Sequence, residues 1–535
     1  MSPTPALSHQ YRGSTVSTDL PSTPSLQAIS FPDTQNPLEI IQYNPDSDAG
    51  GKSCRKRAFD DAPKSIVSQT LKHVSLEDEN GDVQATMTTF GQRLKKRAVF
   101  SEQKRLETAL ARKEGVCYRC KASKRKAMTV VTQNAYAFLQ CDLAQKQSPY
   151  ESCKLCTRTK IYKNIKQMPC FNSDLKNILF FRSRPASTEP FFTTRELLFA
   201  LEEVSRLRVR IETLKLTQRI GDHKLIVYAS EFDPLPGDVV SYKWTDAQGH
   251  HREMMMPHVS LTFIEKVAMH IRQYIDQAKR DYLKTYLVGL RSQDNLARMT
   301  IIAAMDYAKT REGSLVDIAL DLWAICRMIE IPWERCGDDT LGVSQVKDPT
   351  NPHHGKFPIP PIMDTQLDQV VIQYILAPLR EKLIEKLEAS IAPPKPETWF
   401  ETYLAVFILL NHIEQLAHHS ASHAKLHTLP TMYSNVPFLE GVFHTAKTVL
   451  SRFHFVCNGS APFRLDWTSK AATSMARLEP KQVEFMRRSQ EIIQETENDV
   501  LSLRTSHQYG RCLYWCHQLF FDNWDSSFPV QVKVY

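Results

Sequence analysis

The C-terminal half of the chain repeats one pattern, in which apolar residues recur three and four positions apart. This spacing is typical of helices that bury one face. It is clearest in five stretches, residues 259–290, 366–391, 397–419, 438–457 and 481–504. Proline-rich breaks such as "DPTNPHHGKFPIPPIMD" and "APPKPE" separate several of them. We therefore predict one large all-α domain over residues 258–535.

The pattern changes upstream of this domain. Residues 210–217 and 223–230 alternate in character around Gly221-Asp222, which predicts a short β-hairpin. A short helix is expected over 194–207. Apolar residues in this region also fit a heptad spacing for under three heptads, so a coiled coil and a homodimer stay open as the alternative. We assign residues 187–257 as a linker with a short helix and a β-hairpin.

Residues 1–90 show little hydrophobic periodicity and are rich in Pro, Ser, Thr and Asp. A segment of this composition buries too little apolar surface to offset the entropy lost on ordering, so we predict disorder. The N-terminus lacks the pattern of a secretory signal, and no apolar run is long enough to span a membrane. We therefore expect the chain's 12 cysteines to be reduced thiols or metal ligands rather than disulfides.

Half of those cysteines lie in one stretch, which forms two Cys-x-x-Cys pairs and two further thiols. They are Cys117, Cys120, Cys141, Cys153, Cys156 and Cys170. Thiolates two residues apart can reach the same tetrahedral zinc ion, and two pairs supply the four ligands of a closed structural site. The stretch therefore predicts a zinc module.

Charge is concentrated around the same cysteines. Residues 91–186 contain 22 Lys and Arg against 6 Asp and Glu, a net charge of +16, whereas the whole chain carries +8. Four cations lie in the six residues 121–126, directly after Cys120. A basic module on an otherwise acidic chain predicts a polyanionic partner for that module, and a metal followed by a short basic helix indicates DNA.

At these residues the chain resembles the fungal binuclear zinc cluster transcription factors. Their pattern is Cys-x2-Cys-x6-Cys, a loop, Cys-x2-Cys, a spacer and a last Cys, and it matches "GVCYRCKASKRK", "CDLAQKQSPYESCKLC" and "MPC" here. The resemblance implies that the six cysteines hold two zinc ions through two bridging sulfurs. Together with the patterns described above, this predicts a mostly α fold class. It comprises a disordered N-terminus, a small zinc-cluster module over 91–186 (cluster 117–170), a short β-hairpin and the large helical domain.

Two departures from the family pattern stand out. Ala127 occupies the position of the third cysteine, and the uncharged segment Ala127–Gln140 separates "KASKRK" from Cys141. Removing those 14 residues restores the six-residue spacing, so one hypothesis is an error in the gene model, such as a retained short intron. If the segment is genuine, the site is either distorted or reduced to one metal on four cysteines. The last spacer, 13 residues long, also exceeds the usual length.

The resemblance implies that the first basic helix reads CGG-type triplets in double-stranded DNA, with Lys124 contacting guanine. Neighbouring cations and those of the second basic segment are expected to help read bases or to bind phosphates. These residues are Lys121, Arg125, Lys126, Lys154, Arg158 and Lys160. Two further basic clusters predict nuclear import, through Lys95, Lys96, Arg97, Lys104 and Arg105.

The motifs of the common enzyme classes that we sought do not occur in the sequence, which favours a non-enzymatic protein. The resemblance implies a nuclear regulator that recruits the transcription machinery and controls a gene cluster, often one for a secondary metabolite. The alternative is a degenerate zinc-cluster relative that works as a protein-interaction co-regulator without binding DNA. The residues 171–192, "FNSDLKNILFFRSRPASTEPFF", contain Pro and Ser that mark a linker behind the module.

Overall fold

The computed structural model divides the chain into two units, Met1–Lys96 and Arg97–Tyr535. All residues that the structure describes belong to the second unit. They are 102, 105, 117, 119, 120, 153, 155, 156, 170, 175–182, 207–234, 237–338, 341–391, 395–426, 429–469, 477–505, 508–521 and 524–525. The predicted disorder of residues 1–90 and most of the predicted helix over 194–207 lie outside them.

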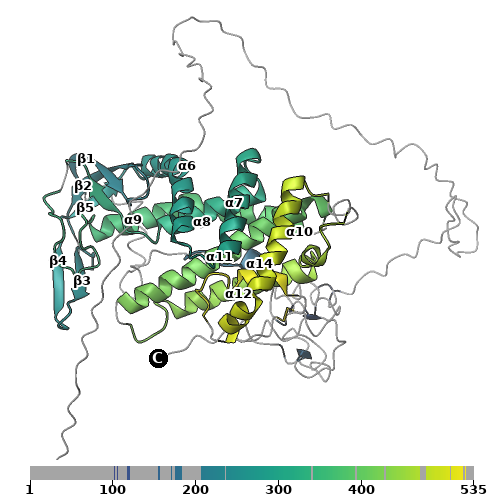
Figure 1. Cartoon of the computed structure of the whole chain (residues 1–535). Helices are drawn as coiled ribbons and strands as arrows, with labels where there is room; N and C mark the ends of the chain where they lie inside the picture. Colours follow the sequence, from purple (N-terminus) through teal and green to yellow (C-terminus); the bar gives the residue numbers. More distant parts are fainter. Residues whose placement is uncertain are drawn as a thin grey trace, which may run out of the picture. The chain divides into compact units, whose positions relative to one another are not determined.

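Helices make up most of the described chain (Figure 1). They are α6 (Ile264–Gly289), α7 (Asn295–Thr310), α8 (Leu315–Met328), α9 (Pro361–Val370), the π-helical η7 (Val371–Leu376), α10 (Ala377–Ile391), α11 (Pro396–Leu426), α12 (Val436–Phe455) and α14 (Pro480–Thr505). Short 3-10 helices are η4 (Leu175–Asn177), η8 (Ala461–Arg464) and η9 (Cys516–Phe520). The five helical stretches predicted from periodicity are confirmed, except that the first one begins as a strand.

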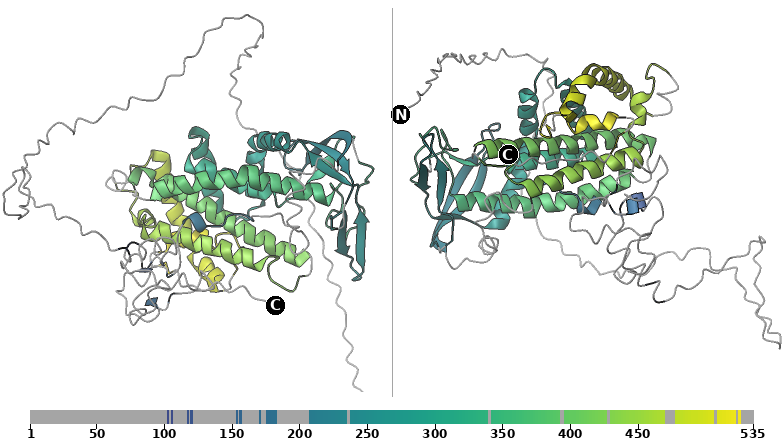
Figure 2. Two further views of the ribbon diagram at one scale, coloured as in Figure 1. Left: turned by 180° about the vertical axis from the view of Figure 1, so that it is seen from behind. Right: turned by 90° about the horizontal axis from the view of Figure 1, so that it is seen from below.

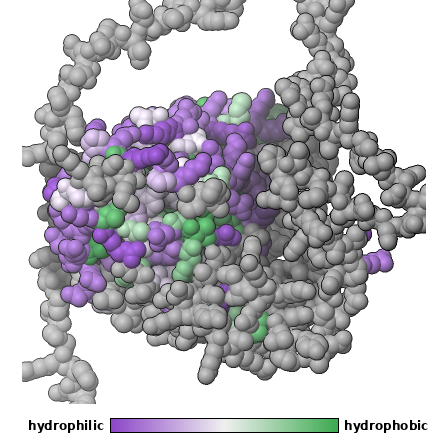
Figure 3. Space-filling model, turned by 90° about the vertical axis from the view of Figure 1, so that its right-hand side faces the viewer, coloured by the Kyte–Doolittle hydropathy of each residue, from purple (hydrophilic) through white to green (hydrophobic). Residues whose placement is uncertain are grey.

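The centre of the helical body is formed by α8 and α11, which pack against each other. The N-cap residue Ser314 starts α8 by accepting a hydrogen bond from the backbone N–H of Asp317. Both helices are apolar around most of their circumference and nearly all of α8 is buried, as expected for helices with neighbours on every side. The described residues on the face shown in Figure 3 are mainly hydrophilic, with hydrophobic ones in small areas.

A four-stranded antiparallel sheet with the order β5-β2-β1-β6 adjoins the helices. The predicted hairpin is confirmed as β1 (Leu207–Thr217) and β2 (Leu225–Phe232). Its loop contains Gly221 at φ +62, where an added Cβ would lie 2.6 Å from a carboxylate oxygen of Asp281. Glycine is favoured here by the left-handed backbone conformation, in which a residue with a Cβ is strained.

The prediction of a purely helical domain from residue 258 onward was wrong in two places. Strands β5 (Val259–Thr262) and β6 (Glu334–Cys336) extend the hairpin into the sheet, with β5 on β2 and β6 on β1. A second hairpin, β3 (Ser241–Thr245) and β4 (His251–Met255), was also not predicted. In Figures 1 and 2 the strands gather at one end of the helices, where α6 contacts β2 and α9 contacts β5.

The segment Leu175–Arg182, called the docking segment below, belongs to the core of the helical body. Four of its side chains are at most 7% exposed and share the main hydrophobic cluster with the helices; they are Leu175, Ile178, Phe180 and Phe181. The interpretation of residues 171–192 as a linker was therefore wrong for this part. The Pro and Ser residues that suggested a linker follow the docking segment, whereas its own apolar residues drive it into the core.

Polar groups on α10 and α12 bind the backbone of the docking segment. The Arg380 guanidinium on α10 donates to the carbonyl oxygens of Lys176, at 2.6 Å, and of Ile178, at 3.1 Å. The hydroxyl oxygen of Thr445 on α12 accepts from the backbone N–H of Leu179 at 2.7 Å. Beyond the short 3-10 helix η4, the segment thus satisfies backbone groups with side chains of the body.

The end of the docking segment enters a buried charged region. The Arg182 guanidinium donates to the backbone oxygen of Ile329 at 2.7 Å and to a carboxylate oxygen of Asp368 at 2.6 Å. Burial raises the pKa of Asp368 to about 7, while Arg182 acts in the opposite direction. Because the arginine gives this buried carboxylate its positive partner, removal of either would leave the other charge unpaired in the core.

A buried histidine on α11, His412, forms a hydrogen bond with the backbone of the docking segment at Phe180. Its environment predicts how the stability of the body depends on pH. The Nε2 of His412 lies 2.6 Å from the backbone oxygen of Phe180, and its Nδ1 lies 3.3 Å from the Arg327 guanidinium. Since the oxygen can only accept and the guanidinium can only donate, the imidazole is neutral with its proton on Nε2. Burial, with Arg327 as the next cause, lowers the pKa of His412 from 6.5 to about 3.

We expect His412 to make the body sensitive to acid. Below pH 6.5 the unfolded chain protonates this imidazole and the folded chain does not, so its stabilising contribution is lost as the pH falls from 6.5 toward 3. The stability advantage of the wild type over His412→Gln should therefore shrink by about 2 kcal/mol between pH 7.5 and pH 5. Urea titrations of both proteins at each pH measure this difference, and a constant difference would contradict it.

Candidate metal centre

Each Cys-x-x-Cys pair folds into the same small turn. In the first pair the backbone N–H of Cys120 donates to the sulfur of Cys117 at 3.3 Å, and in the second the N–H of Cys156 donates to the sulfur of Cys153 at 3.3 Å. The two-residue spacing therefore turns both sulfurs of a pair to the same side. The N–H groups point at the sulfurs, where they favour the negative thiolate over the thiol.

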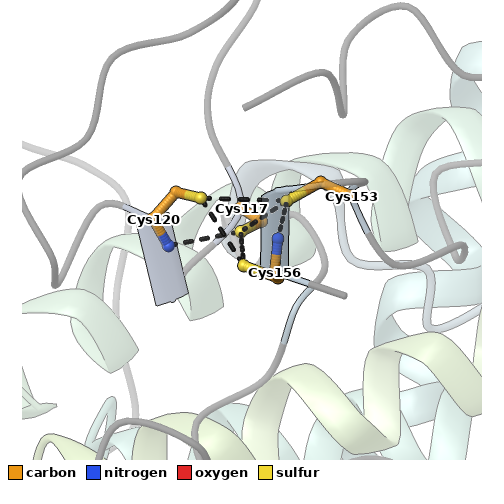
Figure 4. A group of neighbouring side chains, drawn as sticks. All are labelled: Cys117, Cys120, Cys153 and Cys156. Atoms are coloured by element: carbon orange, nitrogen blue, oxygen red, sulfur yellow. Dashed lines mark hydrogen bonds between the residues drawn. The ribbon is translucent and has the colours of Figure 1, made fainter. Parts of the chain in front are cut away.

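The two pairs bring their four sulfurs together (Figure 4). The sulfur of Cys117 lies 3.9 Å from that of Cys153 and 3.7 Å from that of Cys156. The sulfur of Cys120 lies 3.8 Å from that of Cys153 and 3.6 Å from that of Cys156. Sulfurs about 2.3 Å from a tetrahedral zinc ion are separated by about 3.8 Å, so these distances fit one zinc ion at the centre.

Burial and charge also fit a cation. Three of the four side chains are fully buried and the fourth, Cys156, is 8% exposed. Hydrogen bonds with Cys117 and then Cys120 hold the pKa of Cys156 below its usual range, which favours its thiolate. The sulfur separations are far too long for disulfide bonds, which measure about 2.05 Å. Among the residues that the structure describes, these four are the group of His, Cys and acidic side chains close enough to share one ion.

Cys170 lies beside this tetrahedron. Its thiol donates to the sulfur of Cys117 at 3.7 Å, and its own sulfur accepts from the backbone N–H of Cys153 at 3.2 Å. Five of the six predicted zinc ligands are thus brought together. The sixth, Cys141, lies outside the described residues, as does the whole segment Ala127–Gln140 whose origin the sequence left open.

Most predicted DNA-contacting and import residues also lie outside the described chain. This holds for Lys95, Lys96, Arg97, Lys104, Lys121, Lys124, Arg125, Lys126, Lys154, Arg158 and Lys160. Arg105 is described, and it is helical and exposed. The docking segment, which follows Cys170 in the chain, was not predicted, although the spacing of its apolar residues was a signal that could have revealed it.

A search of the described helices for membrane spans finds none with the necessary length and hydrophobicity.

Comparison of the sequence with models of known families identifies the class of protein to which the chain belongs. The model of the KpeA transcription factor family matches residues 181–519, which is more than half of the chain. The chain therefore belongs to the KpeA transcription factor family. The match covers the sheet and the helices and begins after Cys170, so the resemblance of the cysteine stretch to binuclear zinc clusters rests on its own motif.

One curated protein gives a more particular comparison. The chain is 22% identical over 483 residues to a protein of Stachybotrys chartarum (strain CBS 109288 / IBT 7711) described as the satratoxin biosynthesis SC3 cluster transcription factor SAT20. The alignment covers 87% of this chain and 63% of that protein, so the chain spans somewhat less than two thirds of its relative. No solved structure matches the chain.

Proposed function

We propose that this transcription factor is a nuclear, sequence-specific DNA-binding regulator whose DNA-binding module is a zinc centre built on the cysteines of 117–170. The observation that carries the proposal is the tetrahedron of four buried sulfurs inside a stretch of net charge +16. A bound zinc ion supplies the crosslink that lets so short a segment hold one conformation. Around it, the lysines and arginines present positive charge to the phosphates of DNA.

The number of zinc ions follows from which cysteines take part. The four sulfurs of the tetrahedron accommodate one ion. A second ion requires Cys141 and Cys170 with sulfurs shared between the two metals, as the resemblance to the binuclear clusters implies. We propose this two-zinc arrangement, which the position of Cys170 beside Cys117 supports.

The name of the Stachybotrys chartarum relative suggests the kind of genes that this protein regulates. That name assigns the relative to a cluster for satratoxin biosynthesis, and the alignment with it covers most of this chain. We therefore propose that the protein controls a gene cluster for a secondary metabolite, with double-stranded DNA and the transcription machinery as its partners.

The role of Lys124 provides the test of sequence-specific binding. Duplexes selected by the full-length protein from a random library, with CGG-containing duplexes as the first probes, define the preferred site. Lys124→Ala should weaken binding to that site by about 1–3 kcal/mol, roughly 5- to 150-fold, because a lysine bond to a guanine edge is lost. Binding to unrelated duplexes should change little. Fluorescence anisotropy at several salt concentrations measures both.

Lys160→Ala is the matched control for this test. As a predicted phosphate contact, it should weaken binding to all duplexes alike and reduce the salt dependence by about one counterion. If Lys124→Ala lowers the affinity for every duplex equally, Lys124 also contacts phosphate and does not read a base.

A second candidate function is a co-regulator that binds zinc but not DNA. The observations that favour it are Ala127 at the family's third cysteine position and a tetrahedron that four cysteines complete without Cys141. A zinc-loaded protein that selects no duplex from the library, at low as well as physiological salt, would establish this alternative.

A further inference from the structure

The metal centre and the helical body are joined by a very short piece of chain. Cys170 contacts the centre, and Leu175, five residues later, is 1% exposed in the core of the body. Five residues span at most about 17 Å, so Cys170 is confined to the neighbourhood of the site where the docking segment enters the body. In Figure 2 the blue docking segment lies against the green helices, in agreement with its contacts to α10, α11 and α12.

Docking therefore determines how freely Cys170 can move. With the docking segment in place, Cys170 is fixed at one end by the centre and tethered at the other over five residues. Without docking, the next residue of the body that the structure describes is Leu207, and the 36 residues 171–206 separate it from Cys170. A longer connection to the body makes the return of a dissociated ligand less probable, because the entropy cost of loop closure grows with length.

We propose that docking of Leu175–Arg182 holds Cys170 in the metal centre, so that the helical body controls how tightly the centre retains zinc. This inference rests on the proposed function, in which the centre holds zinc. Cys170 contributes through its contact with the sulfur of Cys117 and through the hydrogen bond that it accepts from Cys153. A change in the body that loosens the docking segment thereby reaches the DNA-binding module through Cys170.

The contacts of Arg380 and Thr445 allow docking to be weakened from the body alone. The double variant Arg380→Met/Thr445→Val keeps the bulk of both side chains and removes the bonds to Lys176, Ile178 and Leu179. A second variant, Phe180→Ser, places a hydroxyl at a fully buried position of the docking segment itself. Neither variant changes a cysteine.

The matched control makes the same substitutions elsewhere in the body. Arg272 donates to the backbone oxygen of Tyr374 at 2.8 Å, and the buried Thr300 donates to that of Leu296 at 2.8 Å. Neither residue contacts the docking segment through these bonds. Arg272→Met/Thr300→Val therefore loses comparable bonds of the body and leaves docking intact.

The experiment measures transfer of zinc from the full-length, zinc-loaded proteins to an excess of the chelator 4-(2-pyridylazo)resorcinol. We expect release about tenfold faster from both undocking variants than from the wild type, the lower end of the effect of removing groups that support metal ligands. The control should release zinc at the wild-type rate. Faster trypsin cleavage after Arg182, whose side chain is half-buried and paired with Asp368 in the docked segment, should accompany the faster release.

Unchanged zinc release in both undocking variants would overturn the proposal, whatever the trypsin result. Acceleration in the control to the same extent would also overturn it, since the effect would then come from general loosening of the body. Failure of the proposed function is a separate result, because it appears as a wild-type protein that holds no stoichiometric zinc before any variant is compared.

Discussion

Replacing Cys117 with serine is expected to remove the metal and DNA binding together. The sulfur of Cys117 contacts those of Cys153, Cys156 and Cys170, so its removal takes away a sulfur that three other thiols share. A serine hydroxyl is a poor ligand for zinc at neutral pH because it remains protonated. We expect zinc to fall below stoichiometric amounts and DNA affinity to drop by at least about 100-fold, since the binding energy of a structural zinc is also folding energy.

The control for this prediction is Cys336→Ser. Cys336 lies on β6, and its thiol donates to the backbone oxygen of Lys215, a bond that a serine hydroxyl can also make. This variant should keep the wild-type zinc content, measured by mass spectrometry of the metal, and the wild-type affinity, measured by anisotropy. Normal DNA binding by a zinc-free Cys117→Ser protein would contradict the role proposed for the centre.

The wild-type zinc content in the same experiment separates the two forms of the centre. Two ions per chain are expected if Cys141 and Cys170 complete a binuclear cluster. One ion per chain would show that the tetrahedron of Cys117, Cys120, Cys153 and Cys156 is the whole site. In that case Cys141→Ser should leave the zinc content unchanged.

The local parts of the site could be predicted from the sequence because their geometry is set by neighbouring residues. A Cys-x-x-Cys pair needs only its own turn to bring two sulfurs to one ion, and the described structure shows this for both pairs. The same holds for the helices, since a periodicity of three and four residues identifies the buried face without knowledge of its neighbours. The structure adds that the two pairs meet.

The features that were missed depend on partners distant in the sequence. The strand β6 has three residues, and its pairing partner in β1 lies more than 100 residues earlier, so no local pattern defines it. The docking segment is irregular after the three residues of η4, and its contacts with Arg380, His412 and Thr445 span more than 200 residues. Its apolar residues were visible in the sequence, but the Pro and Ser that follow them favoured a linker.

Glu414→Ala is expected to have the largest effect on the stability of the helical body. The fully buried carboxylate of Glu414, on α11, accepts hydrogen bonds from three backbone N–H groups of the C-terminal segment, those of Leu513 at 3.0 Å, Trp515 at 2.8 Å and Cys516 at 2.9 Å. Burial raises the pKa of Glu414 to about 7, although the three N–H donors act to lower it. Alanine leaves these donors in the core without that acceptor.

An unsatisfied buried donor costs about 1–3 kcal/mol, and some of the loss is recovered by relaxation of the segment. We therefore expect Glu414→Ala to lower the free energy of unfolding by about 3–5 kcal/mol and Tm by roughly 10 °C. Glu414→Gln, which retains one acceptor oxygen, should lose less than half of this. Thermal and urea unfolding followed by circular dichroism measure both variants.

Glu484→Ala is the matched control. Glu484 lies on α14, its side chain is 63% exposed, and it pairs with Arg487 three residues later. Removal of an exposed ion pair of this kind should change the stability by less than about 0.5 kcal/mol. The prediction fails if Glu414→Ala is as mild as this control, because the C-terminal segment would then keep its place over α11 without the three hydrogen bonds. A large loss confined to Glu414 would show that one buried carboxylate fixes the end of the domain to its central helix.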